Sequence, residues 1–142
     1  MTDLRKRVLI VDDEAGVRES IRMVLREPYE AIAVATAAEA LDVLQGEGAE
    51  VALLDIVMPG VDGLRLLEEI RARWPQLPVI MLTATKTVKT AVTAIKLGAA
   101  DYLTKPFDID ELRIALDKAT EKAELVREVE HLRTEVGKRY QI

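Results

Sequence analysis

The sequence contains no cysteine and few aromatic residues, and both shortages narrow the classes of function. Without cysteine, the protein forms no disulfides, zinc–thiolate sites or cysteine nucleophile. Aromatic residues make up only 4% of the chain, so the core must be aliphatic and an aromatic binding platform is disfavoured. No apolar run approaches the roughly 20 residues of a membrane-spanning helix. The apolar run after the basic start at 5–7 is too short for a signal peptide, so we expect a cytoplasmic protein without membrane contact.

Length and charge set further limits. The chain has 142 residues, which is enough for one compact domain with a short appendage. Its 20 basic residues against 25 acidic ones give a formal net charge of −5. Because neutralisation of phosphates dominates the affinity for nucleic acids, an acidic domain is a poor binder of DNA or RNA. We therefore expect no direct contact of this chain with nucleic acid.

Short apolar runs alternate along the chain with helical patterns. Continuous apolar runs without alternation are typical of strands that are buried on both faces of a parallel sheet. The predicted strands are 8–11, 31–34, 51–54, 79–82 and 102–103. A strand followed by a helix, five times over, predicts an α/β fold with a doubly wound, five-stranded parallel sheet. In the common order 2-1-3-4-5 for such a sheet, the first and third strands are neighbours.

The last predicted helix differs from the others because it carries two opposed apolar stripes and continues to about residue 136. One stripe can pack on the domain and comprises Ile109, Leu112, Leu116, Ala119 and Ala123. The other has heptad spacings and comprises Leu125, Val129, Leu132 and Val136, with Ile114 on the same face. Two stripes need two partners. We therefore divide the chain into a domain at 1–120 and a helical linker or dimerisation segment at 121–142.

Five polar residues follow the predicted strands, at the edge where open α/β sheets bind ligands. They are Asp12 and Asp13 after the first strand, Asp55 at the end of the third, Thr83 at the end of the fourth and Lys105 after the fifth. Taken singly, each is weak evidence, because an aspartate after a strand is more often a cap or part of a turn. All five together at the carboxyl ends of the predicted strands indicate a functional site.

The residue types suit phosphoryl transfer. Three neighbouring carboxylates cannot all stay ionised without a cation, and Mg²⁺ is commonly held by a few carboxylates together with water and phosphate oxygens. Transfer also needs a nucleophile, neutralisation of the phosphoryl oxygens and donors that hold the product. An aspartate, a metal ion with Lys105, and the hydroxyl of Thr83 supply these parts.

The stretch from residue 8 to 115 resembles the receiver domain of two-component response regulators. The matching segments are VLIVDDE (8–14), LLDIVMPGVDG (53–63), MLTA (81–84) and GAADYLTKPF (98–107). The resemblance implies that Asp55 accepts a phosphoryl group from a sensor histidine kinase. It implies direct Mg²⁺ ligation by Asp13, Asp55 and the backbone carbonyl of Val57, with Asp12 acting through water. Lys105 would then pair with the phosphoryl oxygens, and a cis bond to Pro106 is expected.

The resemblance also implies a switch rather than an enzyme acting on a separate substrate. Thr83 would move to hydrogen-bond the phosphoryl group, and Tyr102 would turn inward, repacking the surface of the fourth helix, fifth strand and fifth helix. Taken alone, Tyr102 is equally well explained as a half-buried strand residue. Val57 and Thr85 occupy the positions that tune dephosphorylation, and neither can position water, so we expect slow self-hydrolysis.

The tail from residue 118 to 142 resembles the linker of nitrogen-regulation-type response regulators. That family joins the receiver to an AAA+ ATPase, which activates sigma-54 polymerase, and to a DNA-binding domain. The resemblance implies a fragment that precedes such an output domain and pairs with a second copy through its last helix. The exposed stripe fits either that homodimer or docking on the output domain, and the direction in which phosphorylation would shift a dimer stays open.

The sequence argues against three other functions. A phosphatase of the haloacid dehalogenase type needs a second aspartate two residues after its nucleophile, where this chain has Val57. A flavin-binding protein needs a Ser/Thr/Gly-rich loop after the first strand, where Asp12 and Asp13 would repel phosphate. An interaction module with a vestigial acidic site is the third alternative. The presence of Asp55, Thr83 and Lys105 together argues against it.

Overall fold

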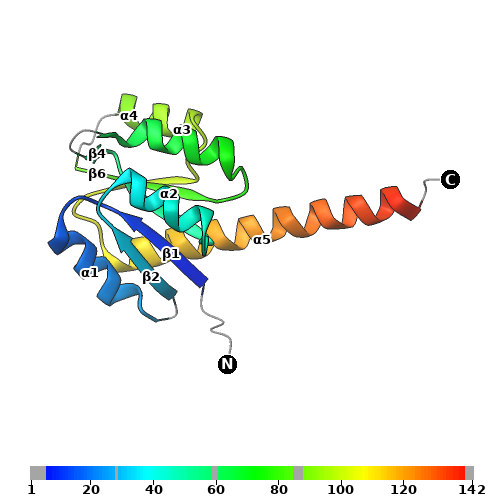
Figure 1. Cartoon of the computed structure of the whole chain (residues 1–142), viewed down its shortest axis with the longest axis horizontal. Coiled ribbons are helices and arrows are strands. Elements are labelled where there is room, and N and C mark those ends of the chain that lie inside the picture. The colour runs from blue at the N-terminus through cyan, green and yellow to red at the C-terminus, as the bar shows by residue number, and fades with distance from the viewer. Residues whose placement is uncertain (1–5, 28, 59–60, 85–87, 140–142) are drawn as a thin grey trace.

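The computed structural model describes residues 6–27, 29–58, 61–84 and 88–139. Its described part forms three layers, with helices on both faces of a central sheet (Figure 1). The last helix continues well beyond the layered body (Figure 1). This is the α/β fold that the alternation of apolar runs and helical patterns predicts.

The central sheet has five parallel strands in the order β2-β1-β3-β6-β7, which is the predicted order 2-1-3-4-5. Its strands are β1 (Lys6–Val11), β2 (Tyr29–Val34), β3 (Val51–Asp55), β6 (Val79–Thr83) and β7 (Asp101–Thr104). Each includes its predicted apolar run and is longer by one or two residues. The three central strands are almost fully buried, which explains why they lack the apolar–polar alternation of a half-exposed sheet.

The helices form two groups, one on each face of the sheet. They are α1 (Ala15–Leu25), α2 (Ala37–Gln45), α3 (Gly63–Arg73), α4 (Val88–Lys96) and α5 (Ile109–Arg139). One apolar cluster packs α2, α3 and α4 on the sheet, and the other packs α1 and α5 on the opposite face. Figure 1 shows α2, α3 and α4 on one side of the strands and α1 on the other, with α5 running behind β1 in this view.

A short hairpin follows β3. Its strands are β4 (Val57–Met58) and β5 (Val61–Asp62), which pair antiparallel. Asp62 then caps α3, because its carboxylate accepts a hydrogen bond of 2.9 Å from the backbone N–H of Leu64. The backbone N–H of Gly63 in turn donates to the carbonyl of Ile56 at 2.9 Å. The hairpin thus closes on the end of β3, where the predicted site begins.

The first stripe of α5 packs on the domain as predicted, except at its start. Leu112, Leu116 and Ala119 are buried, whereas Ile109 is 47% exposed. The prediction for Ile109 is therefore wrong, because this first residue of α5 precedes the part of the helix that lies on the sheet. Asp108 caps α5, because its carboxylate accepts a hydrogen bond of 3.1 Å from the backbone N–H of Asp110.

Two side-chain contacts tie α5 to the far end of the sheet from the predicted site. The phenol of Tyr29 donates a hydrogen bond to the carboxylate of Asp117, and Lys6 pairs with Glu124 at 2.8 Å. Beyond these contacts, α5 continues as one unbroken helix. Its second stripe is exposed at Ile114, Leu125, Val129 and Leu132. The side chain of Val136 lies outside the described residues. Within the described part of the chain, no helix has the length and apolar character needed to cross a membrane.

Candidate functional site: a carboxylate cluster closed by a lysine

Strand register brings the predicted site residues to one edge of the sheet. In the ladder between β1 and β3, Val11 lies opposite Leu54, so the residues that follow, Asp12 and Asp55, extend side by side. In the ladder between β6 and β7, Thr83 lies opposite Thr104. The backbone N–H of Lys105 donates to the Thr83 carbonyl at 2.6 Å. The parallel sheet alone therefore gathers Asp12, Asp55, Thr83 and Lys105.

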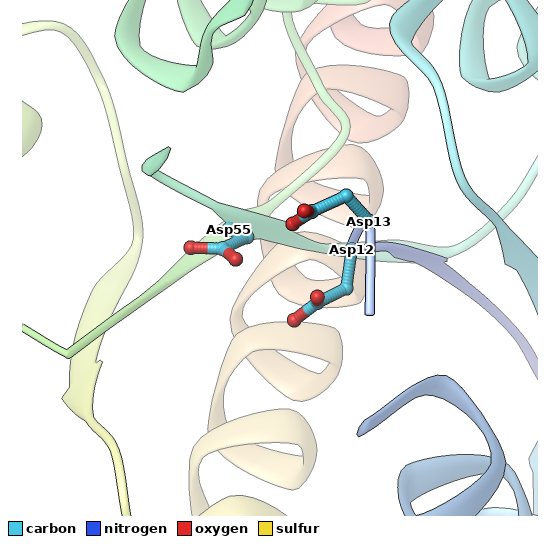
Figure 2. Close-up of side chains that lie close together, drawn as sticks. All are labelled: Asp12, Asp13 and Asp55. Carbon is cyan, nitrogen blue, oxygen red and sulfur yellow. The ribbon is translucent and has the colours of Figure 1, made fainter. Parts of the chain in front are cut away.

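Three carboxylates form the centre of this site. Figure 2 shows Asp12 and Asp13 at the end of β1 beside Asp55 at the end of β3. One carboxylate oxygen from each lies within 4.8 Å of the other two. Asp12 is fully buried and Asp55 is 6% exposed, whereas Asp13 is exposed. Such close carboxylates repel one another unless a cation joins them.

Lys105, which follows the edge strand β7, supplies one such cation. Its ammonium donates to Asp12 Oδ2 at 2.7 Å and lies 3.3 Å from Asp55 Oδ2. Burial by itself would lower the pKa of Lys105, but the hydrogen bond to Asp12 and the charges of Asp12 and Asp55 outweigh it, so the pKa is raised. The peptide bond from Lys105 to Pro106 is cis, as expected.

Asp12 is held at all four of its polar groups. Its backbone N–H donates to Val34 at 3.2 Å, and its two carboxylate oxygens accept from the N–H of Glu14 at 2.9 Å and from Lys105. Its backbone carbonyl accepts a hydrogen bond of 2.7 Å from Nη1 of Arg18, on the first turn of α1. Sequence reasoning does not select Arg18, because one arginine on an amphipathic helix is indistinguishable from a solvated residue.

The two residues that the resemblance assigned to the switch occupy different environments. Thr83 is fully buried at the end of β6, next to the carboxylate cluster. Tyr102 lies in β7 opposite Met81, is partly buried, and packs against the cluster that includes Ala94 of α4. Thr83 and Tyr102 therefore lie on β6 and β7, the two strands that follow β3 in the order of the sheet.

The backbone that follows Asp55 is packed closely against α3. A Cβ added to Gly63 would lie 2.3 Å from the Asp55 carbonyl oxygen and 2.7 Å from Ile56 Cα. Only glycine allows this approach of α3 to the end of β3. Val57, whose carbonyl was predicted as a metal ligand, begins β4 two residues after Asp55. Thr85, predicted to tune dephosphorylation, lies outside the described residues.

The carboxylate cluster fits a small divalent cation. Mg²⁺ holds oxygen ligands at 2.0–2.1 Å, so two ligands on opposite sides of one ion lie about 4.2 Å apart. The spacing of at most 4.8 Å between the carboxylate oxygens requires only a small inward movement, or one ligand acting through water. After pairing with Lys105, the three carboxylates still carry an excess of negative charge. Both the spacing and the charge therefore suit Mg²⁺.

Comparison with protein families agrees with the geometry. The model of the response regulator receiver domain matches residues 8–117, which span β1 to the first third of α5. The matched range contains the carboxylate cluster and Lys105, together with all five strands of the main sheet.

Three proteins that are similar to this chain are several times longer than it is. A putative NtrX-like response regulator of Rickettsia bellii is 42% identical over 132 residues, covering 91% of this chain and 28% of that protein. The DNA-binding transcriptional regulator NtrC of Escherichia coli is 42% identical over 113 residues, covering 79% of this chain and 24% of NtrC. The crystal structure of NtrX from Brucella abortus in complex with ADP has a TM-score of 0.86 at 36% identity, covering 94% of this chain and 30% of that one. The chain thus spans less than a third of these relatives.

Proposed function

The chain belongs to the family of response regulator receiver domains, and from this premise we propose that it is a phosphorylation-controlled switch in which Asp55 accepts a phosphoryl group from a sensor histidine kinase. The observation that carries the proposal is the position of Asp55. Its carboxylate lies within reach of two further carboxylates that suit Mg²⁺ and 3.3 Å from the ammonium of Lys105. A nucleophile, a metal site and a fixed cation therefore meet at one point.

In the proposed transfer, a carboxylate oxygen of Asp55 attacks the phosphorus of a phosphohistidine. A P–O bond to Asp55 forms as the P–N bond breaks, and the released imidazole nitrogen keeps the electron pair of that bond. Asp13, Asp55 and the carbonyl of Val57 would hold Mg²⁺ directly, and Asp12 would hold it through water. When bound, the ion neutralises charge on the phosphoryl oxygens. Lys105 supplies a second positive charge to the same oxygens.

The acyl phosphate would then act on the packing of the domain. The buried hydroxyl of Thr83 is the donor that we assign to the phosphoryl group, and its movement would open space into which Tyr102 can turn. β7, the strand of Tyr102, adjoins α4, which exposes Val92 and Ile95 to solvent. We propose that the α4-β7-α5 surface is the output surface of this switch. Because Val57 and Thr85 offer no group that positions water, the phosphorylated state should hydrolyse slowly.

A groove beside the carboxylate cluster suits the kinase. It has a volume of about 600 Å³ and is lined by apolar side chains of α1 and by Phe107, Ile109 and Leu112. Lys105, which contacts Asp55, also lines it. An amphipathic helix of the kinase whose apolar face filled this groove would bring a phosphohistidine close to Asp55. The exposure of Ile109 at the start of α5 fits this role.

The second part of the proposal concerns α5. We assign residues 1–120 to the receiver and residues 121–142 to a helical linker that leads to an output domain. Because Leu125, Val129 and Leu132 are exposed at heptad spacings, we propose that this segment forms a homodimer through a coiled coil. By analogy with NtrC, the output would be transcriptional, with an AAA+ ATPase that acts on sigma-54 polymerase and a separate DNA-binding domain. The acidic receiver itself would contact no DNA.

Intact-mass spectrometry tests the phosphorylation step directly. The protein is incubated with Mg²⁺ and acetyl phosphate, a small phosphoryl donor that needs no kinase. We expect the gain of one phosphoryl group that requires Mg²⁺ and is abolished by Asp55→Asn. The matched control is Asp42→Asn, an exposed aspartate on α2, which should be phosphorylated as the wild type is. No gain of mass in the wild type would favour the alternative of an interaction module with a vestigial acidic site.

A further inference from the structure

A side chain of α1 holds the backbone that carries Asp13, one of the three carboxylates of the cluster. Asp13 is exposed, so packing does not fix its carboxylate as it fixes those of Asp12 and Asp55. Its position depends on the peptide that joins it to Asp12. The oxygen of that peptide is the Asp12 carbonyl, and Nη1 of Arg18 lies 2.7 Å from it. We infer that Arg18 is a positioning residue that holds the Asp12–Asp13 peptide and so aims the carboxylate of Asp13 at the metal position; this rests on the proposed function of the site.

The length and nature of this hydrogen bond support the inference. A bond of 2.7 Å from a guanidinium to a carbonyl is short and charge-assisted, and such bonds are about twice as strong as neutral ones. Arg18 is itself only partly exposed, which limits the competition of water for this bond. The contact is therefore a fixed restraint rather than a transient surface contact.

The rest of the turn directs the restraint toward Asp13. The Asp12 side chain is already held by Lys105 and by the N–H of Glu14, and the Asp12 N–H is held by β2. Without Arg18, the peptide plane after Asp12 would be the one unit of this residue able to rotate. Rotation of that plane redirects the Cα–Cβ bond of Asp13, because the plane ends at its Cα. Arg18 thus acts on the carboxylate through the backbone.

Arg18 also brings a positive charge near the site, and this effect has the opposite sign. A cation beside a metal site weakens metal binding, so removing the charge alone would tighten it. Removing the restraint would weaken it, because the free Asp13 must be ordered when the ion binds. The charge effect is small for a partly exposed group in salt. We therefore expect the loss of position to dominate, and the sign of the change in Mg²⁺ affinity distinguishes the two effects.

Isothermal titration of the protein with Mg²⁺ measures this sign. We expect Arg18→Met to raise the dissociation constant for Mg²⁺ by about tenfold, which corresponds to about 1.4 kcal/mol. Arg18→Lys keeps the charge and one donor at nearly the same reach, and should recover part of the affinity. The matched control is Arg22→Met, which removes the same charge from an exposed site one turn further along α1, where Arg22 pairs only loosely with Glu19 at 3.7 Å. Its dissociation constant should change less than twofold.

Amide hydrogen exchange in the metal-free protein gives a second readout that does not depend on Mg²⁺. The N–H of Glu14 is bonded within the same turn, to Asp12 Oδ1, so its exchange reports the order of that turn. We expect about tenfold faster exchange at Glu14 in Arg18→Met and no change in Arg22→Met.

The inference would be overturned if Arg18→Met bound Mg²⁺ as tightly as the wild type or more tightly. It would also be overturned if Arg18→Met and Arg22→Met shifted the dissociation constant equally. In each case, phosphorylation of Asp55 in the wild type would leave the proposed function standing. A wild type that binds no Mg²⁺ would overturn both.

Discussion

Lys105 donates a hydrogen bond of 2.7 Å to Asp12, a residue 93 positions earlier in the chain. The two residues follow β7 and β1, which are separated in the sheet by β3 and β6. The lysine side chain therefore reaches across the carboxyl ends of two strands, and on the way its ammonium comes within 3.3 Å of Asp55. This bridge neutralises part of the charge of two buried carboxylates and places the cation where a phosphoryl group on Asp55 would need it.

The bridge predicts that Lys105 stabilises the metal-free protein. Replacing Lys105 with Met leaves two buried carboxylates facing each other without a counter-charge. We expect the free energy of unfolding at pH 7, without divalent cations, to fall by about 1–3 kcal/mol in urea titrations. Added Mg²⁺ should narrow the difference, because it takes over part of the neutralisation. Lys96→Met, an exposed lysine on α4, is the control and should change stability by less than about 0.5 kcal/mol. An unchanged midpoint for Lys105→Met would contradict the prediction.

A loss of stability at alkaline pH is predicted from Tyr29. Burial and the hydrogen bond to Asp117 raise the pKa of its phenol, so the folded state holds this proton more tightly than the unfolded chain. The stability that Tyr29 contributes is then complete below the unfolded pKa of about 10 and is lost as the pH rises above it.

Urea titrations between pH 8 and pH 11 measure this loss. One such group contributes a slope of up to about 1.4 kcal/mol per pH unit above pH 10. Tyr29→Phe should make the slope shallower. It should not abolish the slope, since the raised pKa of Lys105 acts in the same direction. At pH 7 the same variant should lose about 1–3 kcal/mol, because Asp117 loses its donor. Equal slopes for the variant and the wild type would show that folding does not raise the pKa of the Tyr29 phenol.

Close packing at Gly63 predicts that an alanine there would displace the backbone of Asp55. The Cβ of an alanine there would meet the backbone of Asp55 and Ile56, which cannot move aside as a flexible side chain can. We expect Gly63→Ala to lower the free energy of unfolding by about 1–3 kcal/mol and to slow the phosphorylation of Asp55 by acetyl phosphate.

Gly16 offers a matched control for that substitution. It also lies at the start of a helix, and a Cβ added to it has no neighbour within 4 Å. Gly16→Ala should therefore stabilise the protein by about 0.5–1 kcal/mol through its helix propensity. Equal effects of the two substitutions would show that the contact at Gly63 has no structural cost.

The position of the site residues at one edge of the sheet was predictable, because it depends only on the strands being parallel. Once the apolar runs are recognised as parallel strands, Asp12, Asp55, Thr83 and Lys105 must lie at one edge of the sheet. No knowledge of side-chain conformation is needed for that step. The family resemblance adds the identity of the nucleophile, which the spacing of three carboxylates does not distinguish.

Contacts that depend on side-chain direction were not predictable in the same way. The hydrogen bond from Arg18 to Asp12 needs the angle at which α1 leaves β1, and the sequence pattern is silent on that angle. The exposure of Ile109 depends on where α5 first lies on the sheet, not on helical periodicity. The pairing of Lys6 with Glu124 likewise shows that α5 contacts the domain a turn beyond residue 120, because the helix passes the lower end of β1 before it projects away.

The exposed stripe of α5 leads to the last prediction, which concerns assembly. Leu132 is 52% exposed on a helix that no described residue of the domain covers at that point. In a parallel coiled coil, Leu132 would face its copy in the second chain, and a glutamate there would bury two like charges. Leu132→Glu should therefore shift the protein from dimer to monomer in sedimentation equilibrium, with a dissociation constant weaker by at least about tenfold.

The control for Leu132→Glu must alter an exposed apolar residue elsewhere. Met23→Glu on α1 meets this need, because Met23 is 65% exposed and lies far along the chain from the stripe. It should leave the sedimentation profile unchanged. A wild type that is already monomeric, or a Leu132→Glu variant that stays dimeric, would rule out pairing through this stripe. The stripe would then have to be covered by an output domain, since a row of exposed leucine and valine at heptad spacing is unfavourable in water.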